Sequence, residues 1–311
     1  MTMRKMLLLL IAGLFSLQIA TAANPAPAAK FKPFPADTVQ KFIKKYGKDS
    51  LVHLLDERIA KAQRYVSLQH INMRDNFVAM ETKLYSKHFG LGLDTLDFKS
   101  TYTSGLIYKL YGNFYGDEQT HVKNLEQMKS QKLDLMQLFY QNMTSIYGRT
   151  GFTTLCKYVD IPAEALDTLY KYRFVLMAGD KIQHYWVFAE YNKNCHDKHP
   201  KIDEYQKSFY SELYKTYNFR QILVKGDTLT KTNSEIINLY YPARVLAYGL
   251  YSNEVSLENQ GDNLMYLLHL QNNSDGGWPI YNEAYRQGNI NASVYGLWAL
   301  CEFREKVKAL K

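Results

Sequence analysis

Cysteine and proline are scarce in this 311-residue chain, and each scarcity limits the folds that the chain can adopt. Three cysteines permit at most one internal disulfide, so bridges cannot replace a hydrophobic core. A chain of this length can bury such a core. Four of the eight prolines fall within residues 23–35, which leaves four for residues 36–311 and permits long helices there.

The sequence leaves the disulfide pairing among its three cysteines open. Cys156 and Cys301 lie in apolar helical stretches and are predicted to be inert core thiols, and Cys195 lies in a polar segment.

Long apolar runs are also absent outside the first 22 residues. Two cations precede an apolar run over residues 7–20, and Ala20-Thr21-Ala22 has the small residues of a cleavage site, so residues 1–22 are predicted to be a signal peptide. The run is too short to span a bilayer, which takes roughly 20 apolar residues. We therefore expect an exported protein, periplasmic or extracellular, without a transmembrane segment in the mature chain. Residues 23–36 read as a Pro/Ala-rich tether and residues 37–311 as a single helical domain.

The charge balance is basic. The chain carries a formal charge of +8, and removal of Arg4 and Lys5 with the signal peptide leaves +6. Such a balance is compatible with an acidic glycan, an anionic lipid or a nucleic acid and identifies none of them. Among these partners we expect a glycan and no nucleic acid.

Helical periodicity dominates the rest of the chain. Apolar residues recur at helical spacing in six stretches, residues 49–66, 117–148, 162–179, 181–192, 203–217 and 234–252. Residues 222–230 are consistent with a short hairpin. Dipeptides such as Gly179-Asp180 and Gly261-Asp262 predict tight turns in which Gly closes one helix and Asp opens the next. A weak repeat relates "ARVLAYGLYS" at Ala243 to "ASVYGLWALC" at Ala292, which favours paired, stacked helices in an all-α fold.

The segment "YLLHLQNNSDGGW", from Tyr266 to Trp278, resembles the QW motif of the α/α toroid superfamily, which includes terpenoid cyclases, protein prenyltransferase β subunits and a family of pectate lyases. The motif positions are Tyr266, Leu267, Gln271, Gly276 and Trp278, and the likeness covers residues 233–305. It implies helical hairpins in a full or partial barrel, with the Gln and Trp tying neighbouring helices together. Independently of any family, Asp275, Gly276 and Gly277 predict a turn, and residues 292–303 predict a helix that is buried on nearly all sides.

The branches of that superfamily match this sequence to different extents. "DTLD" at Asp94–Asp97 does not match the Asp-x-Asp-Asp motif of isoprenoid cyclases, and export also disfavours that branch. "QNNSDGGWP" resembles the pectate lyase branch, but that branch has an acidic loop where this chain has "RQGNINASV". Calcium is therefore implied as a cofactor only if the chemistry is lyase-like; otherwise the sequence leaves the cofactor open.

The segment that follows Trp278 is the predicted ligand site. Aromatic faces stack on sugar rings, so the expected substrate-binding residues are Trp278, Tyr281, Asn282 and Tyr285. Glu283 is the candidate acid or base and Arg286 the candidate partner of a uronate carboxylate.

One further cluster contains metal-ligating residue types. His196, Asp197 and His199 are weak candidates for a metal site, because their spacing matches no common zinc pattern and a polar interhelical loop explains them better. Two functions remain open: a protein that binds or processes a carbohydrate, in the manner of a polysaccharide lyase, and a non-catalytic binding or scaffold protein. An isoprenoid cyclase is the least favoured.

Overall fold

A computed structural model describes residues 34–35, 37–98, 126, 130, 156–157, 160–220, 239–279 and 288–311. Every regular element in these ranges is helical, and an isolated antiparallel bridge joins Trp278 to Asn289. The chain is therefore all-α in its described part, as the sequence predicts. The principal helices are α2 (Thr38–Tyr46), α3 (Lys48–Gln69), α4 (Asn76–Phe89), α9 (Ala163–Tyr172), α10 (Ala178–Cys195), α11 (Ile202–Tyr217), α13 (Tyr240–Tyr251), α14 (Gly261–Leu270) and α15 (Ile290–Lys308).

Helix α3 shows how the periodicity forms the core. Leu51, Leu55, Ile59, Ala62 and Val66 fall three or four residues apart, and all five are buried. Charged and polar residues separate them on the solvent side, so the helix buries one stripe. The predicted helix over residues 49–66 is thereby confirmed.

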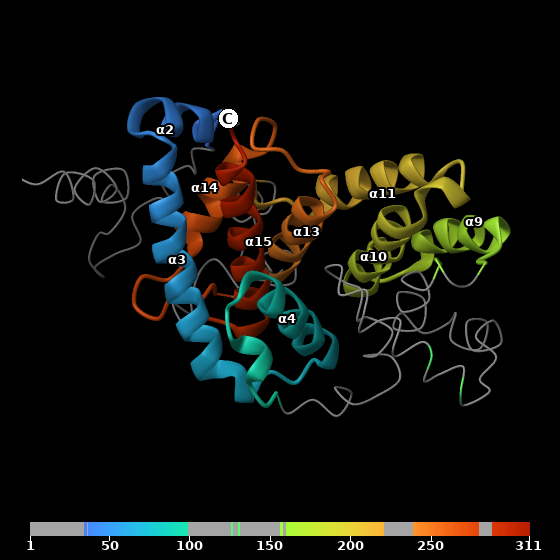
Figure 1. Cartoon of the computed structure of the whole chain (residues 1–311), viewed down its shortest axis with the longest axis horizontal. Helices are drawn as coiled ribbons and strands as arrows, with labels where there is room; N and C mark the ends of the chain where they lie inside the picture. The colour runs from blue at the N-terminus through green and yellow to red at the C-terminus, as the bar shows by residue number, and fades with distance from the viewer. Residues whose placement is uncertain are drawn as a thin grey trace, which may run out of the picture.

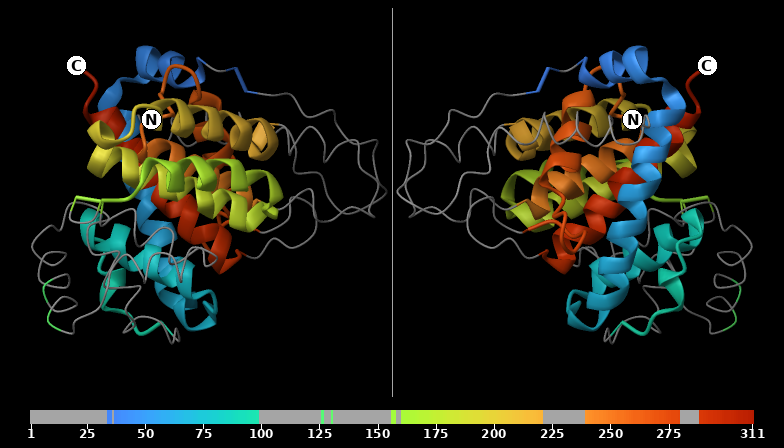
Figure 2. Two further views of the ribbon diagram at one scale, coloured as in Figure 1. Left: turned by 90° about the vertical axis from the view of Figure 1, so that its right-hand side faces the viewer. Right: turned by 90° about the vertical axis from the view of Figure 1, so that its left-hand side faces the viewer.

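Helix α15 is the centre of the fold. Its residues from Ala292 to Cys301 are all buried, so it is surrounded rather than lying on a surface. It packs against α3, α13, α4 and α14 (Figures 1 and 2). Gly296 lets α15 approach Trp278, since a Cβ at this position would lie 2.7 Å from the indole ring. The predicted buried helix over residues 292–303 is confirmed.

The weak repeat in the sequence marks two neighbouring helices. Its copies at Ala243 and Ala292 lie on α13 and α15, which pack side by side (Figure 1). Both helices are buried along most of their length, because most of their residues up to Tyr251 and Cys301 are small, aliphatic or aromatic.

The two described Gly-Asp dipeptides begin helices instead of separating them. Gly179 is the second residue of α10, and Gly261 is the first residue of α14. Neither glycine has a positive φ, because the preceding helices have already ended. The prediction that Gly closes a helix is therefore wrong at both positions. The predicted helix over residues 162–179 is likewise divided, at Tyr172, by a 3-10 turn over Arg173–Val175.

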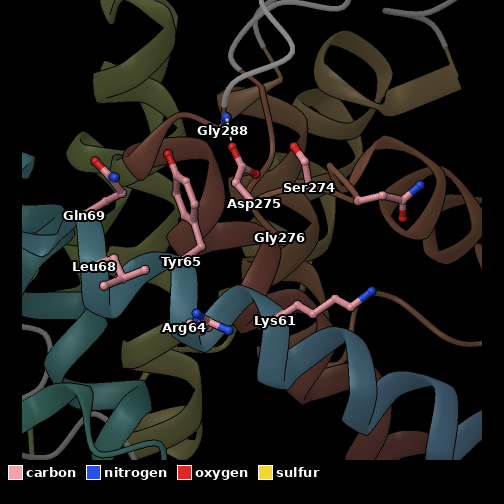
Figure 3. Close-up of a pocket in the computed structure, with 10 residues that line it drawn as sticks. Lys61, Arg64, Tyr65, Leu68, Gln69, Ser274, Asp275, Gly276 and Gly288 are labelled. Carbon is pink, nitrogen blue, oxygen red and sulfur yellow. Dashed lines mark hydrogen bonds between the residues drawn. The ribbon is translucent and has the colours of Figure 1, made fainter.

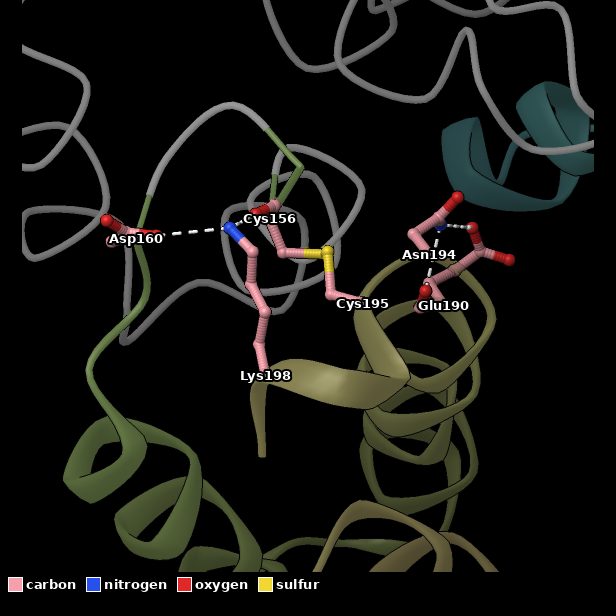
Figure 4. The surroundings of a disulfide bond; sticks show 6 residues. All are labelled: Cys156, Asp160, Glu190, Asn194, Cys195 and Lys198. Atoms are coloured by element: carbon pink, nitrogen blue, oxygen red, sulfur yellow. Dashed lines mark hydrogen bonds and ion pairs between the residues drawn. A yellow bond between two sulfur atoms is a disulfide. The ribbon is translucent and has the colours of Figure 1, made fainter. Parts of the chain in front are cut away.

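A disulfide joins Cys156 to Cys195 at the end of α10, with a Cα–Cα distance of 6.1 Å (Figure 4). The prediction that Cys156 is an inert core thiol is therefore wrong. Lys198 Nζ donates to the carbonyl oxygen of Cys156 at 2.8 Å and pairs with Asp160 at 3.1 Å, which reinforces the attachment. Cys301 is a buried free thiol, as predicted, and burial raises its pKa.

Several predictions lie outside the described residues. These are the signal peptide over residues 1–22, most of the tether over 23–36, the helix over 117–148 apart from residues 126 and 130, and the hairpin over 222–230. Within the described part of the chain, no helix is both long enough and apolar enough to cross a membrane.

Candidate functional site

The QW-like segment forms a joint between three helices. The side-chain amide of Gln271 donates to the carbonyl oxygens of Arg58 on α3, at 3.0 Å, and of Gly276, at 2.8 Å. The indole nitrogen of Trp278 donates to the carbonyl oxygen of Leu267 on α14 at 2.7 Å. Its backbone nitrogen donates to Ser293 Oγ on α15 at 2.8 Å. The motif residues therefore tie α3, α14 and α15 together.

Gly276 allows this joint to close against α3. Its φ is +84°, and a Cβ there would lie 2.6 Å from the carbonyl oxygen of Lys61. A side chain at this position would meet both a strained backbone conformation and a clash with backbone. The turn predicted at Asp275, Gly276 and Gly277 is confirmed.

Trp278 belongs to the joint and not to a ligand surface. Its side chain is 1% exposed, and its ring lies against Gly296. We therefore correct its assignment as a substrate-binding residue, because a buried ring cannot stack on a sugar. Tyr266 is also buried, and its hydroxyl accepts a hydrogen bond from the backbone of Phe34 at 3.1 Å.

Replacing Gln271 with alanine is expected to lower the free energy of unfolding by about 2 kcal/mol, because two carbonyl oxygens lose their donor. Chemical denaturation measures the change. Asn273→Ala is the control, since Asn273 is exposed on the same turn and its loss is expected to cost less than about 0.5 kcal/mol. Equal losses in the two variants would contradict the structural role of Gln271.

Asp275 fixes the two ends of the segment that contains most of the predicted site. One carboxylate oxygen accepts from the backbone of Gly277 and the other from that of Gly288, both at 2.9 Å. The backbone of Asn289 also donates to Trp278 at 2.7 Å. Gly277 and Gly288, at the two ends of the segment, therefore lie close together. Tyr281, Asn282, Glu283, Tyr285 and Arg286 belong to this segment and lie outside the described residues.

A cavity of about 630 Å³ lies beside these two fixed ends (Figure 3). Helix α3 contributes one wall and the turn contributes the other. Its lining includes Lys61, Arg64, Tyr65, Asp275, Gly276 and Gly288. The volume is within the range of small-molecule sites.

The charge of this cavity is positive. Lys61 and Arg64 are exposed on one face of α3, and Asp275, the acid in the lining, already accepts two backbone hydrogen bonds. A third cation, Arg58, donates to Asn273 at 3.1 Å next to the lining. Burial, followed by the nearby charge of Asp275, raises the pKa of Tyr65 to about 12, so its hydroxyl stays protonated at neutral pH. The cavity thus offers cations and hydroxyl groups to an acidic, hydroxylated ligand.

Sequence reasoning did not find Lys61, Arg64 or Tyr65. The i, i+3 spacing of the two cations places them on one helix face. However, the sequence around these two residues does not indicate that this helix face packs against the turn near residue 275.

The predicted metal ligands do not form one cluster. His196 Nδ1 lies 2.6 Å from Asp197 Oδ1 on the surface. His199 is buried, with Nε2 at 3.5 Å from Asp167 and Nδ1 accepting from the backbone of Lys201. Among the described residues, no group of three or more His, Cys, Asp or Glu side chains is arranged to hold a metal ion.

A buried ionic network lies at the contact of α4, α13 and α15. Tyr248 and Tyr295 donate to the two oxygens of Glu81, and Arg244 Nη2 lies 3.6 Å from the same carboxylate. Arg244 also donates to the hydroxyls of Tyr248 and Tyr240, both at 3.0 Å. Burial raises the pKa of Glu81 to about 7, although the Arg244 charge and the tyrosine hydroxyls oppose the shift.

This network is part of the core. Glu81 is 1% exposed and Arg244 is 3% exposed, so a ligand does not reach their charged groups. Strongly perturbed ionisable groups often mark functional sites, but structural ion pairs perturb pKa values as well. Because Glu81 and Arg244 are buried, we assign them to a structural ion pair and not to a functional site.

No protein-family model matches the chain, and neither a curated protein nor a solved structure matches it. The resemblance to the α/α toroid superfamily accordingly depends on the sequence of residues 233–305.

Proposed function

We propose that this protein is an exported carbohydrate-binding protein whose ligand is an acidic polysaccharide. The observation that carries the proposal is the cationic cavity beside the QW-like turn, with Lys61 and Arg64 exposed in its lining. Carboxylates of a uronate chain pair with these cations, and sugar hydroxyls bind the polar groups around Asp275. A polymer engages several such groups at once, which compensates for the weakness of single exposed ion pairs.

Lyase chemistry is the second candidate. Both ends of the segment that contains Glu283 and Arg286 lie at this cavity, since the backbones of Gly277 and Gly288 bind the Asp275 carboxylate. In that case Glu283 acts as the acid or base and Arg286 neutralises a uronate carboxylate.

The proposal includes an α/α toroid-like arrangement of helical hairpins. The all-α content, the buried α15 and the joint made by Gln271 and Trp278 support it. Export is supported by the Cys156–Cys195 disulfide, because such bonds persist mainly in oxidising compartments.

The double charge reversal Lys61→Glu/Arg64→Glu tests the binding site. It is expected to weaken binding to polygalacturonate or alginate at least tenfold, because two attractive contacts become repulsive. Affinity electrophoresis or calorimetry measures this loss, and added salt is expected to weaken wild-type binding as well. Lys171→Glu/Lys207→Glu is the matched control, since it makes the same charge change at exposed positions on α9 and α11.

Equal losses in the two double variants would overturn the assignment of the cavity. To test the enzymatic candidate, the wild-type protein is incubated with the same polymers, with and without calcium, and ultraviolet absorbance reports unsaturated products. Product that disappears in Glu283→Ala and Arg286→Ala supports a lyase. Binding without product supports the non-catalytic protein.

A further inference from the structure

Exposed apolar side chains gather at the turn between α9 and α10. Among the described residues, seven large apolar side chains are exposed, and four of them lie within six consecutive residues: Tyr172, Phe174, Val175 and Met177, which are between 44% and 79% exposed. Single exposed apolar residues are normal on a monomer, whereas a contiguous group marks an interaction surface. We call these four residues the apolar turn.

Arg173 fixes the shape of the apolar turn. Its side chain is buried, and it donates to Glu212 on α11 at 3.2 Å and to the carbonyl oxygen of Tyr170 at 2.5 Å. The guanidinium carbon lies 3.6 Å from the centre of the Tyr170 ring and 3.9 Å from the centre of the Phe174 ring. Phe174 is therefore held against this group while most of its surface stays exposed. A surface that is ordered before it binds loses less conformational entropy on binding.

The area of the apolar turn fits one side of a homodimer interface. At about 150–200 Å² for a whole side chain, the four residues together expose roughly 400–500 Å². One partner in an interface of standard size buries about 800 Å², of which about 65% is apolar in homodimers. The apolar turn thus supplies most of the apolar surface that such a dimer needs.

Two residues of opposite charge border the apolar turn. Lys171, the residue before it, and Asp180, three residues after it, are both exposed. Around a two-fold axis the same surface of two copies meets in opposite directions, which brings Lys171 of each copy to Asp180 of the other. Asp167, one turn before Lys171 on α9, competes little for its ammonium group, because exposed helix pairs of this kind are weak. The apolar turn is therefore complementary to a second copy, whereas an anionic membrane surface would repel Asp180.

We propose that two copies of this chain form a symmetric dimer through the apolar turn. Phe174, Val175 and Met177 of the two copies pack against one another, because a few well-packed residues near the centre carry most of the binding energy of such a contact. Lys171 and Asp180 form the rim and set the relative direction of the copies. Helices α9 and α10 lie at the end of the molecule away from α3 (Figure 1), so the dimer leaves the cavity beside the QW-like turn accessible. The inference does not rest on the proposed polysaccharide binding.

Analytical ultracentrifugation of the full chain over a wide concentration range tests the proposal, and a reversible monomer–dimer equilibrium is expected. Phe174→Ser/Met177→Ser is expected to raise the dissociation constant of the dimer at least tenfold, because both copies lose apolar contacts. Leu68→Ser/Ile71→Ser is the matched control, since it changes two exposed apolar residues near the end of α3. This control is expected to leave the dimer unchanged.

Mixing two charge variants tests the direction of the contact. Lys171→Asp places like charges opposite each other in its own dimer, and so does Asp180→Lys, so each variant is expected to dimerise at least fivefold more weakly than wild type. In the mixed dimer both pairs again have opposite charges. An equimolar mixture is therefore expected to form the mixed dimer in preference to either homodimer. A change within one copy cannot produce this preference.

Three results would overturn the proposal: a monomer at every concentration, equal effects of the two serine double variants, or no preference for the mixed dimer. A monomer that binds anionic vesicles through Phe174 would assign the apolar turn to a membrane instead. Lys61→Glu/Arg64→Glu is expected to dimerise like wild type even if the protein binds no polysaccharide, so the two proposals fail separately. Since Lys171→Glu alters this contact, the polymer control that contains it is measured at concentrations at which the protein is monomeric.

Discussion

Replacing Arg244 with methionine is expected to lower the free energy of unfolding by about 3–5 kcal/mol, the usual cost of leaving one partner of a buried ion pair uncompensated. Arg244 Nη2 lies 3.6 Å from Glu81, and both residues are at least 97% buried. Methionine is long and apolar, so it fills part of the space and limits the effect of a cavity. Urea denaturation monitored by circular dichroism at pH 7 or above measures the change.

A double-mutant cycle separates the charge effect from lost packing. In Arg244→Met/Glu81→Gln neither charge of the pair remains, so we expect the double variant to be more stable than Arg244→Met alone. The instability of the single variant is also expected to shrink in acid, where the Glu81 carboxyl becomes protonated. If the double variant is as unstable as the sum of the two single variants, Arg244 and Glu81 are not coupled in the way that the structure indicates.

The second large effect is a pH dependence of stability that originates in Glu190. This carboxyl is fully buried, and burial raises its pKa to about 7, although the Lys193 charge and the hydrogen bonds from Tyr251 and Asn194 oppose the shift. The folded state therefore holds the Glu190 proton more tightly than the unfolded state, whose pKa is near 4.5. Its contribution to stability is fully present below about pH 4.5 and is lost as the pH rises through about 7.

The expected size of this effect is about 3 kcal/mol, since each pKa unit corresponds to about 1.4 kcal/mol. Glu190→Gln cannot titrate, so the difference in unfolding free energy between wild type and this variant is expected to change by that amount between pH 4.5 and 8. Other carboxyls contribute to both proteins and cancel in the difference. Asp167 is one of them, and its pKa is lowered, mainly by a hydrogen bond from Tyr205.

Glu258→Gln is the control for this measurement, because Glu258 is exposed and its substitution is expected to leave the pH profile unchanged. A wild-type profile parallel to that of Glu190→Gln across the whole range would contradict the assignment to Glu190.

The candidate ligand sites show the limit of local information. Lys61 and Arg64 share a helix face, and the glycines near residue 276 predict a turn, yet the cavity exists only because α3 packs against that turn. A cavity of about 380 Å³ between α10, α11 and α13 likewise depends on the meeting of three helices whose residues share no motif. The sequence pointed to residues 281–286, which lie outside the described part of the chain.

Local sequence also could not predict how the cysteines and the buried charges pair. Nothing local distinguishes Cys156 from Cys301 as a partner for Cys195, because pairing depends on which Cα atoms approach within about 7 Å. Similarly, Glu81 and Arg244 form a buried pair only because α4 and α13 pack against each other.

The sequence by itself determined the burial of two helices and the joint. Helical spacing of apolar residues determined which stripe of α3 is buried, and the uniformly apolar character of residues 292–303 determined that α15 is enclosed. Gln271, Gly276 and Trp278 determined the turn, since these residue types have local conformational and hydrogen-bonding preferences. Tertiary structure alone decided the Cys156–Cys195 bond, the Glu81–Arg244 pair and both cavities, because each depends on the distance between helices that are remote in the sequence.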